Sequence, residues 1–131
     1  MQTSARQNYP AGVPHEIDPG QYRSLPHMFD EAFARYADRP FSVCMERWMS
    51  YGELDTLSKA LGAWLQSLGL EPGARVAIML PNVPQFAVTM CGVLRAGYTC
   101  VNVNPLYTAR ELEHQLKDSG ATAIVILENF A

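Results

Sequence analysis

Cysteine and histidine are scarce in this sequence, and their scarcity excludes several classes of protein. The chain has 131 residues with three cysteines and three histidines, all widely spaced and without a CxxC pair. Isolated cysteines in odd number do not build a disulfide framework or a zinc site, and they favour a reducing cytoplasm. We therefore predict no metal site and no disulfide among Cys44, Cys91, Cys100, His15, His27 and His114.

Long apolar runs and a strong charge of one sign are also missing. The longest apolar runs, VAIML (76–80) and AIVIL (123–127), are far shorter than the ~20 residues that cross a bilayer as a helix. The opening residues MQTSARQNYPAGVP contain no stretch typical of a secretory signal. The net charge of −3 predicts no basic surface for nucleic acid. An apolar fraction of 48% is ordinary for one globular domain or part of one.

Motifs that carry chemistry are absent as well. The sequence contains no P-loop, no GxGxxG and no GxSxG elbow, and its serines have no neighbouring His–Asp pair. We predict no catalytic, cofactor-binding or metal-binding residue in this chain. Several methionines stand at apolar positions and are interpreted as core residues: Met28, Met45, Met49, Met79 and Met90.

What the sequence does contain begins with an arm and a small α+β segment. Residues 1–23 include three prolines and little apolar periodicity, which predicts an extended arm. Residues 24–40 predict a helix with Pro26 in its first turn, and residues 41–51 predict a hairpin that turns near Glu46–Arg47. The apolar face of that helix is formed by Leu25, Met28, Phe29, Ala32, Phe33 and Tyr36.

Three similar units follow, each with a capped helix start, a glycine stop and an apolar strand. Strands that alternate with helices predict right-handed crossovers and a parallel sheet, so the fold class is α/β. The starts are Ser50/Glu53, Asn82/Gln85 and Thr108/Glu111, and the stops are Gly69, Gly97 and Gly120. Residues 71–81 are predicted as a turn and a buried strand, and 98–103 and 122–127 as strands. The apolar stripe expected to face inward from the first of these helices is Leu54, Leu57, Leu61, Trp64, Leu65 and Leu68.

Open parallel sheets bind ligands beyond the carboxyl ends of their strands. Asn82, Asn102 and Asn104 stand there and could offer amide groups, but Asn82 as a helix cap and Asn104 as a turn residue are the favoured interpretations. Arg110 in the first turn of a helix opposes the helix dipole, which an anion would compensate; a solvated arginine is the simpler interpretation. The last apolar strand ends close to residue 131, and we expect a longer polypeptide to cover that edge.

Several segments resemble the adenylate-forming superfamily. MSYGEL (49–54) is similar to its (L/M)-(T/S)-Y-x-E-L signature, GARVAIMLPN (73–82) to its G-(D/A)-R-V-A strand, and LRAGYTCVNVNP (94–105) to its second core motif. The stretch 101–126 most resembles bacterial long-chain fatty acid–CoA ligases. The resemblance implies that residues 24–131 are an incomplete, N-terminal portion of the adenylation domain, preceded by the arm 1–23.

The resemblance also implies a two-step reaction for the parent enzyme. A fatty acid carboxylate attacks the α-phosphate of ATP to give an acyl-adenylate and pyrophosphate, and coenzyme A then displaces AMP. The parent would use ATP, Mg²⁺ and coenzyme A, whose binding groups in this family lie in later segments, so none is expected to bind this chain. A cytoplasmic enzyme with peripheral contact at the inner membrane, or a homodimer, also fits the resemblance. No helix here is strongly basic on one face, so we find no helical membrane signal.

Two other functions remain open from the residues. One is a self-contained module that binds a nucleotide or an acyl chain at the strand ends. The other is an interaction domain whose proline-containing arm docks onto another subunit.

Overall fold

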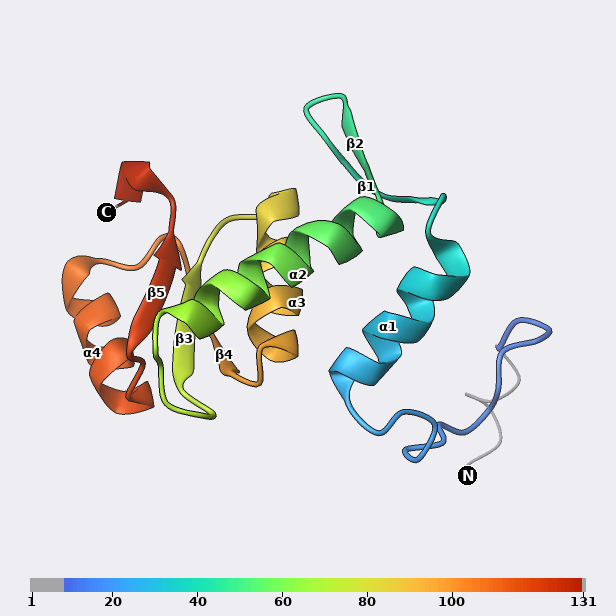
Figure 1. The fold of residues 1–131 in the computed structure, drawn as a ribbon, viewed down its shortest axis with the longest axis horizontal. Helices are drawn as coiled ribbons and strands as arrows, with labels where there is room; N and C mark the ends of the chain where they lie inside the picture. Colours follow the sequence, from blue (N-terminus) through green and yellow to red (C-terminus); the bar gives the residue numbers. More distant parts are fainter. Residues whose placement is uncertain (1–8, 131) are drawn as a thin grey trace.

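The structure is a computed structural model that describes residues 9–130, and it has the predicted α/β architecture (Figure 1). Residues 9–24 contain turns but neither helix nor strand, and the first eight residues of the predicted arm lie outside the described residues. In chain order the elements are α1 (Leu25–Tyr36), β1 (Pro40–Cys44), β2 (Arg47–Ser50), α2 (Tyr51–Ser67), β3 (Arg75–Met79), α3 (Pro84–Arg95), β4 (Thr99–Asn102), α4 (Ala109–Ser119), β5 (Ala123–Ile126) and the 3-10 helix η2 (Glu128–Phe130).

The predicted parallel sheet is confirmed, with the strand order β4-β3-β5. Alternate residues of the central strand β3 point to opposite faces, as the pleat of a strand requires. Val76 and Ile78 pack with Leu65 of α2 and Val93 of α3, whereas Ala77 joins the cluster that contains Leu112 of α4. The sheet is therefore a middle layer, with α2 and α3 on one face and α4 on the other (Figure 1).

Local capping signals place two of the helices as predicted. Ser50 caps α2 and Thr108 caps α4, each in a reciprocal capping box with the glutamate three residues later. Gly120 ends α4 with a left-handed φ of 65°, a conformation that glycine adopts without steric cost.

The start of α3 differs from the prediction. Asn82 does not cap this helix; the N-cap is Val83, which makes no side-chain hydrogen bond, and the helix begins at Pro84. Proline suits the first helical position, and it holds the residue before it in an extended conformation. These two constraints move the helix start past Asn82.

The buried face of α2 also differs from the predicted stripe. Leu54 and Leu65 are buried as expected, but Ser58 and Gly62 complete the buried face. The reason is a close approach to α3, because a Cβ at Gly62 would lie 3.1 Å from the carbonyl oxygen of Gly92. The helices therefore meet along small residues, and three members of the predicted stripe are exposed: Leu57, Trp64 and Leu68.

Two predictions near the N-terminal helix need correction. Leu25 was placed on the apolar face of α1, but it is exposed, since the packed part of that helix begins a turn later at Phe29. The hairpin turn comprises Met45 and Glu46, one residue earlier than predicted, because Cys44 pairs with Arg47. Met45 is consequently not a core residue; it is 92% exposed.

Candidate functional site

The carboxyl edge of the sheet is the candidate site, and its loops are held by their own hydrogen bonds. The Asn104 side-chain oxygen accepts a hydrogen bond from the Leu106 amide at 3.0 Å, and the Asn104 carbonyl accepts one from the Tyr107 amide at 3.1 Å. Such contacts are typical of asparagine as a turn residue. The favoured interpretation of Asn104 from the sequence is confirmed.

The other two asparagines lie at this edge without forming one cluster with Asn104. Asn102 uses its backbone: its carbonyl oxygen accepts a hydrogen bond of 2.9 Å from the Gln115 side chain, which fastens α4 to β4. The side chains of Asn82 and Asn102 belong to exposed residues. Among the described residues, neither side chain has a hydrogen-bond partner that would assign it a role.

The segment from Pro105 to the start of α4 is a well-capped loop. The Glu111 carboxylate accepts a hydrogen bond of 2.8 Å from the Thr108 amide. This bond from the backbone, joined by one from the Thr108 hydroxyl, holds the pKa of Glu111 below its ordinary value of 4.5. The carboxylate is therefore charged at neutral pH and completes the capping box at the positive end of the helix.

A shallow hollow of about 520 Å³ lies along α4, and Arg110 lines it. Glu111, His114, Gln115 and Asp118 line it as well, so charges of both signs face the same space. The described residues give Arg110 no ion pair. Tyr107 also lines the hollow, but within the described residues no hydrogen bond joins its hydroxyl to His114 or Asp118. The predicted absence of catalytic residues in this chain stays a prediction.

Arg95 lies at the centre of an ion-pair network, a role that the sequence did not indicate. Its guanidinium lies 3.0 Å from the Asp30 carboxylate of α1 and 2.7 Å from the Asp55 carboxylate of α2. The same group donates to the Ser58 hydroxyl at 2.9 Å and lies 5.1 Å from the centroid of the Phe33 ring. Its side chain is 12% exposed. Arg95 therefore ties α3 to both α1 and α2.

Asp55 shows how this network balances burial against charge. Burial alone would raise the pKa of the Asp55 carboxyl, but hydrogen bonds and charge from Lys59 and Arg95 outweigh it. The pKa of Asp55 therefore lies below its ordinary value of 3.8. The signal in the sequence is the arginine of LRAG (94–97), which sits in the last turn of a helix; nothing local reveals that two carboxylates from other helices meet it.

Two of the three cysteines are not poised for chemistry. Burial raises the pKa values of Cys91 and Cys100 to about 11, so both thiols stay protonated at neutral pH. All three cysteines are free. Within residues 9–130 there is no group of three or more histidine, cysteine, aspartate or glutamate residues that could hold a metal ion. The same part of the chain has no helix long and apolar enough to span a membrane.

Comparison with known proteins places these features in a family. The model of the AMP-binding enzyme family matches residues 29–130. The long-chain-fatty-acid–CoA ligase of Escherichia coli O6:H1 is 57% identical over 94% of this chain, and that of Bacillus subtilis strain 168 is 38% identical over 92%. The chain spans about a fifth of the length of these relatives, 22% and 21%.

A solved structure supports the same placement. The N-terminal subdomain of Klebsiella oxytoca NpsA in complex with anthranilyl-AMSN superposes with a TM-score of 0.78 and 30% sequence identity. The match covers 82% of this chain and 28% of that one. Sequence and fold therefore agree: the chain belongs to the AMP-binding enzyme family.

Proposed function

We propose that this chain forms the N-terminal scaffold of an ATP-dependent, AMP-forming long-chain fatty acid–CoA ligase of the cytoplasm. The observation that carries the proposal is the 57% identity to the E. coli ligase over 94% of the chain. The parent protein would join a fatty acid to coenzyme A through an acyl-adenylate. Because the fatty acid partitions into lipid, the proposal includes peripheral contact of the parent protein with a membrane.

The residues described here do not fit the nucleotide and its Mg²⁺ ion. Residues 9–130 offer no cluster of carboxylates for a metal, and the sequence has no glycine-rich phosphate loop. The proposal therefore assigns no chemical step to this chain.

The proposed role of the chain is to hold the carboxyl edge of the sheet in one conformation. The Asn104 turn, the capping box of α4 and the bond from Gln115 to Asn102 fix the loop between β4 and α4. On the side of the sheet opposite α4, the ion pairs of Arg95 hold α3 to α1 and to α2. A rigid support of this kind reduces the cost of positioning reactive groups that other segments supply.

The first test uses the 131-residue chain by itself. We expect no ATP–pyrophosphate exchange with fatty acids of any chain length, because the groups that activate the carboxylate are not among its residues. Calorimetry should likewise detect no saturable binding of ATP or AMP. Exchange above the background of a heat-denatured sample would contradict the scaffold assignment.

A chimera tests the assignment directly. The region of the E. coli ligase that aligns with this chain is replaced by this chain, and acyl-CoA formation is measured with fatty acid dispersed in detergent. We expect the chimera to retain ligase activity with long-chain fatty acids, since the scaffold is exchangeable between relatives. A folded but inactive chimera would count against the proposal.

A further inference from the structure

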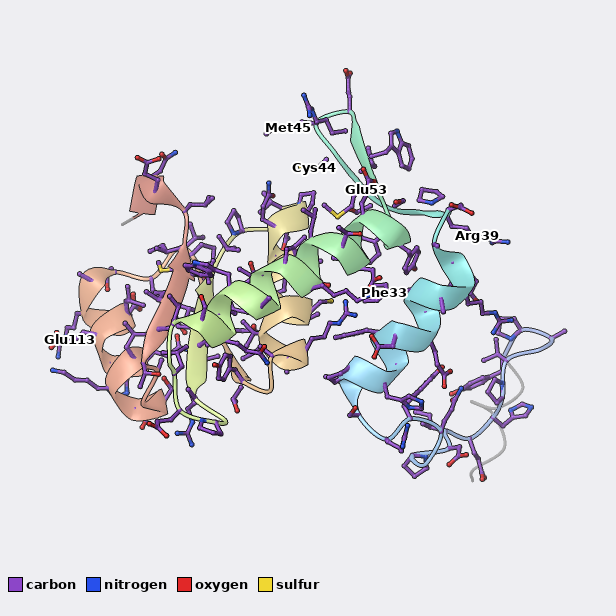
Figure 2. The ribbon with its side chains drawn as sticks, in the orientation of Figure 1. Phe33, Arg39, Cys44, Met45, Glu53 and Glu113 are labelled. Atoms are coloured by element: carbon purple, nitrogen blue, oxygen red, sulfur yellow. The ribbon has the colours of Figure 1, made fainter. Side chains whose placement is uncertain are left out.

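The start of α1 has a histidine where the other two helices with a side-chain cap have a glutamate. The Ser24 hydroxyl accepts a hydrogen bond of 3.2 Å from the His27 amide, as a serine N-cap does. In α2 and α4 the residue three positions after the cap is Glu53 or Glu111, which accepts a hydrogen bond from the backbone amide of its cap. Figure 2 shows Glu53 in the first turn of α2. In α1 the imidazole of His27 stands in that position.

The imidazole of His27 has two hydrogen-bond partners. Its Nδ1 accepts a hydrogen bond of 3.3 Å from the backbone amide of Arg23, and its Nε2 lies 3.1 Å from the Glu31 carboxylate. A ring nitrogen that accepts a hydrogen bond carries no proton, so the hydrogen of the neutral ring is on Nε2 and is donated to Glu31. The two contacts therefore describe a neutral His27, which joins the chain before α1 to the helix.

A proton on Nδ1 of His27 would break the contact with Arg23. The protonated ring has a hydrogen on both nitrogens and cannot accept one, so two N–H groups would face each other. The positive end of the helix dipole also disfavours a cation in the first turn. The contact with Glu31 favours the proton, because it becomes an ion pair in acid. Protonation therefore exchanges the bond to the preceding chain for a stronger bond within the helix.

Two further groups lie near this ring. The Tyr22 ring meets the imidazole of His27 edge-on, with 6.1 Å between the centroids. Asp30 is paired with Arg95 at 3.0 Å, so its charge is already compensated. Glu31 is therefore the carboxylate that responds to the charge of His27.

The pH at which this contact responds differs from that of the other caps. Histidine ordinarily changes its charge between about pH 5 and 8. Hydrogen bonds from Ser50 and Thr108 hold the pKa values of Glu53 and Glu111 below 4.5. Mild acid should therefore change the start of α1 and leave the starts of α2 and α4 intact.

We propose that His27 forms a pH-sensitive contact that holds residues 9–23 to α1 at neutral pH and releases them in mild acid. Figure 1 shows this segment beside α1 and away from the sheet, so its release leaves the sheet and its core in place. The Ser24 hydroxyl has no charge to change, so the helix itself stays capped. The inference goes beyond the proposed function, because it concerns α1 and the chain before it.

The test follows individual amides of the ¹⁵N-labelled 131-residue chain by NMR from pH 8 to pH 5. We expect the Arg23 amide resonance to shift with the same midpoint as the ring signals of His27. Its protection from hydrogen exchange, corrected for the intrinsic effect of pH, should fall about tenfold when the hydrogen bond is lost. The Ser50 and Thr108 amides, bonded to glutamates at 2.7 and 2.8 Å, are internal controls and should not change.

A matched pair of variants assigns the response to one ring. His27→Gln keeps a side chain that occurs in capping boxes and removes the titrating group, so the pH response of the Arg23 amide should disappear. His114→Gln makes the same change on α4, where the histidine lines the hollow. This second variant should keep the response of the Arg23 amide.

Three outcomes would overturn the proposal. They are an Arg23 amide that does not respond between pH 8 and pH 5, an equal response in His27→Gln, and a simultaneous change at Ser50 and Thr108. The last would indicate a general loosening of the fold instead of a local contact. Ligase activity is measured in none of these experiments, so failure of the proposed function remains distinguishable from failure of this inference.

Discussion

Arg95 connects three helices through its guanidinium. A cation with 12% exposure is stable only where opposite charges and hydrogen bonds compensate its lost hydration. Asp30, Asp55 and the Ser58 hydroxyl supply this compensation from two other helices. Removing the guanidinium takes one of two cations from Asp55, which keeps Lys59, and the ion-pair partner from Asp30. The buried position makes this loss larger than that of a surface ion pair.

Replacing Arg95 by methionine tests this account at the residue scale. We expect Arg95→Met to lower the free energy of unfolding by about 2–4 kcal/mol, measured by urea denaturation. Arg110→Met removes a cation that lines an open hollow and should change stability by less than about 0.5 kcal/mol. Equal effects of the two substitutions would show that the network around Arg95 contributes nothing specific.

The crossing of α2 and α3 is the feature that matters most at the scale of elements. The helices approach through Ser58 and Gly62 of α2 and Gly92 of α3, where no side chain separates the backbones. Helical periodicity identified α2 but assigned Leu57 and Trp64 to its inner face. Periodicity ranks residues by hydrophobicity, whereas the contact selected small residues that permit close approach.

Gly92→Ala distinguishes packing from intrinsic helix propensity. In an open helix, replacement of glycine by alanine stabilises by about 1 kcal/mol. Here the new Cβ would lie 3.0 Å from the Ser58 carbonyl oxygen and 3.1 Å from a Leu61 methyl carbon, so we expect destabilisation of about 1–3 kcal/mol. A thermal unfolding midpoint above that of the parent chain would show that the helices separate freely.

For the whole molecule, the carboxylates decide how stability responds to acid. Asp55, Glu53 and Glu111 all have folded-state pKa values below their ordinary values of 3.8, 4.5 and 4.5. For Asp55 the cause is the ion-pair network that overcomes its burial, and for the two glutamates it is chiefly the backbone amide of their capping residues. Because the unfolded chain binds these protons more tightly, protonation favours unfolding.

We therefore expect stability to be complete above about pH 5 and to decline as the pH falls through the folded pKa values. Urea midpoints measured from pH 7 to pH 2.5 would follow this decline. Asp55→Asn should be less stable than the parent at pH 7, and the difference should narrow in acid, where the parent loses the same charge. A constant difference across the range would show that the Asp55 charge is not involved.

Comparison of prediction and structure shows where local information ends. Ser50, Thr108 and Gly120 act on their own helix ends, so their roles could be inferred from a few neighbouring residues. Asn82 misled the prediction, because Pro84, two residues later, imposed a different start. The role of Arg95 was missed, because it depends on residues 37 to 65 positions away. The exposure of Met45 was missed, because it depends on where the hairpin stands in the fold.

Secondary structure, the α/β class, the parallel sheet and the resemblance to the AMP-binding enzyme family followed from the order of residues alone. Capping, periodicity and motif spacing depend on residues that are close together in the chain, so they can be recognised from the sequence alone. Three features followed only from the packed fold. They are the buried face of α2, the two carboxylates that lie against Arg95, and the exposed position of Met45 in a left-handed turn. All three depend on segments that are far apart in the sequence, and these segments come together only when the chain folds.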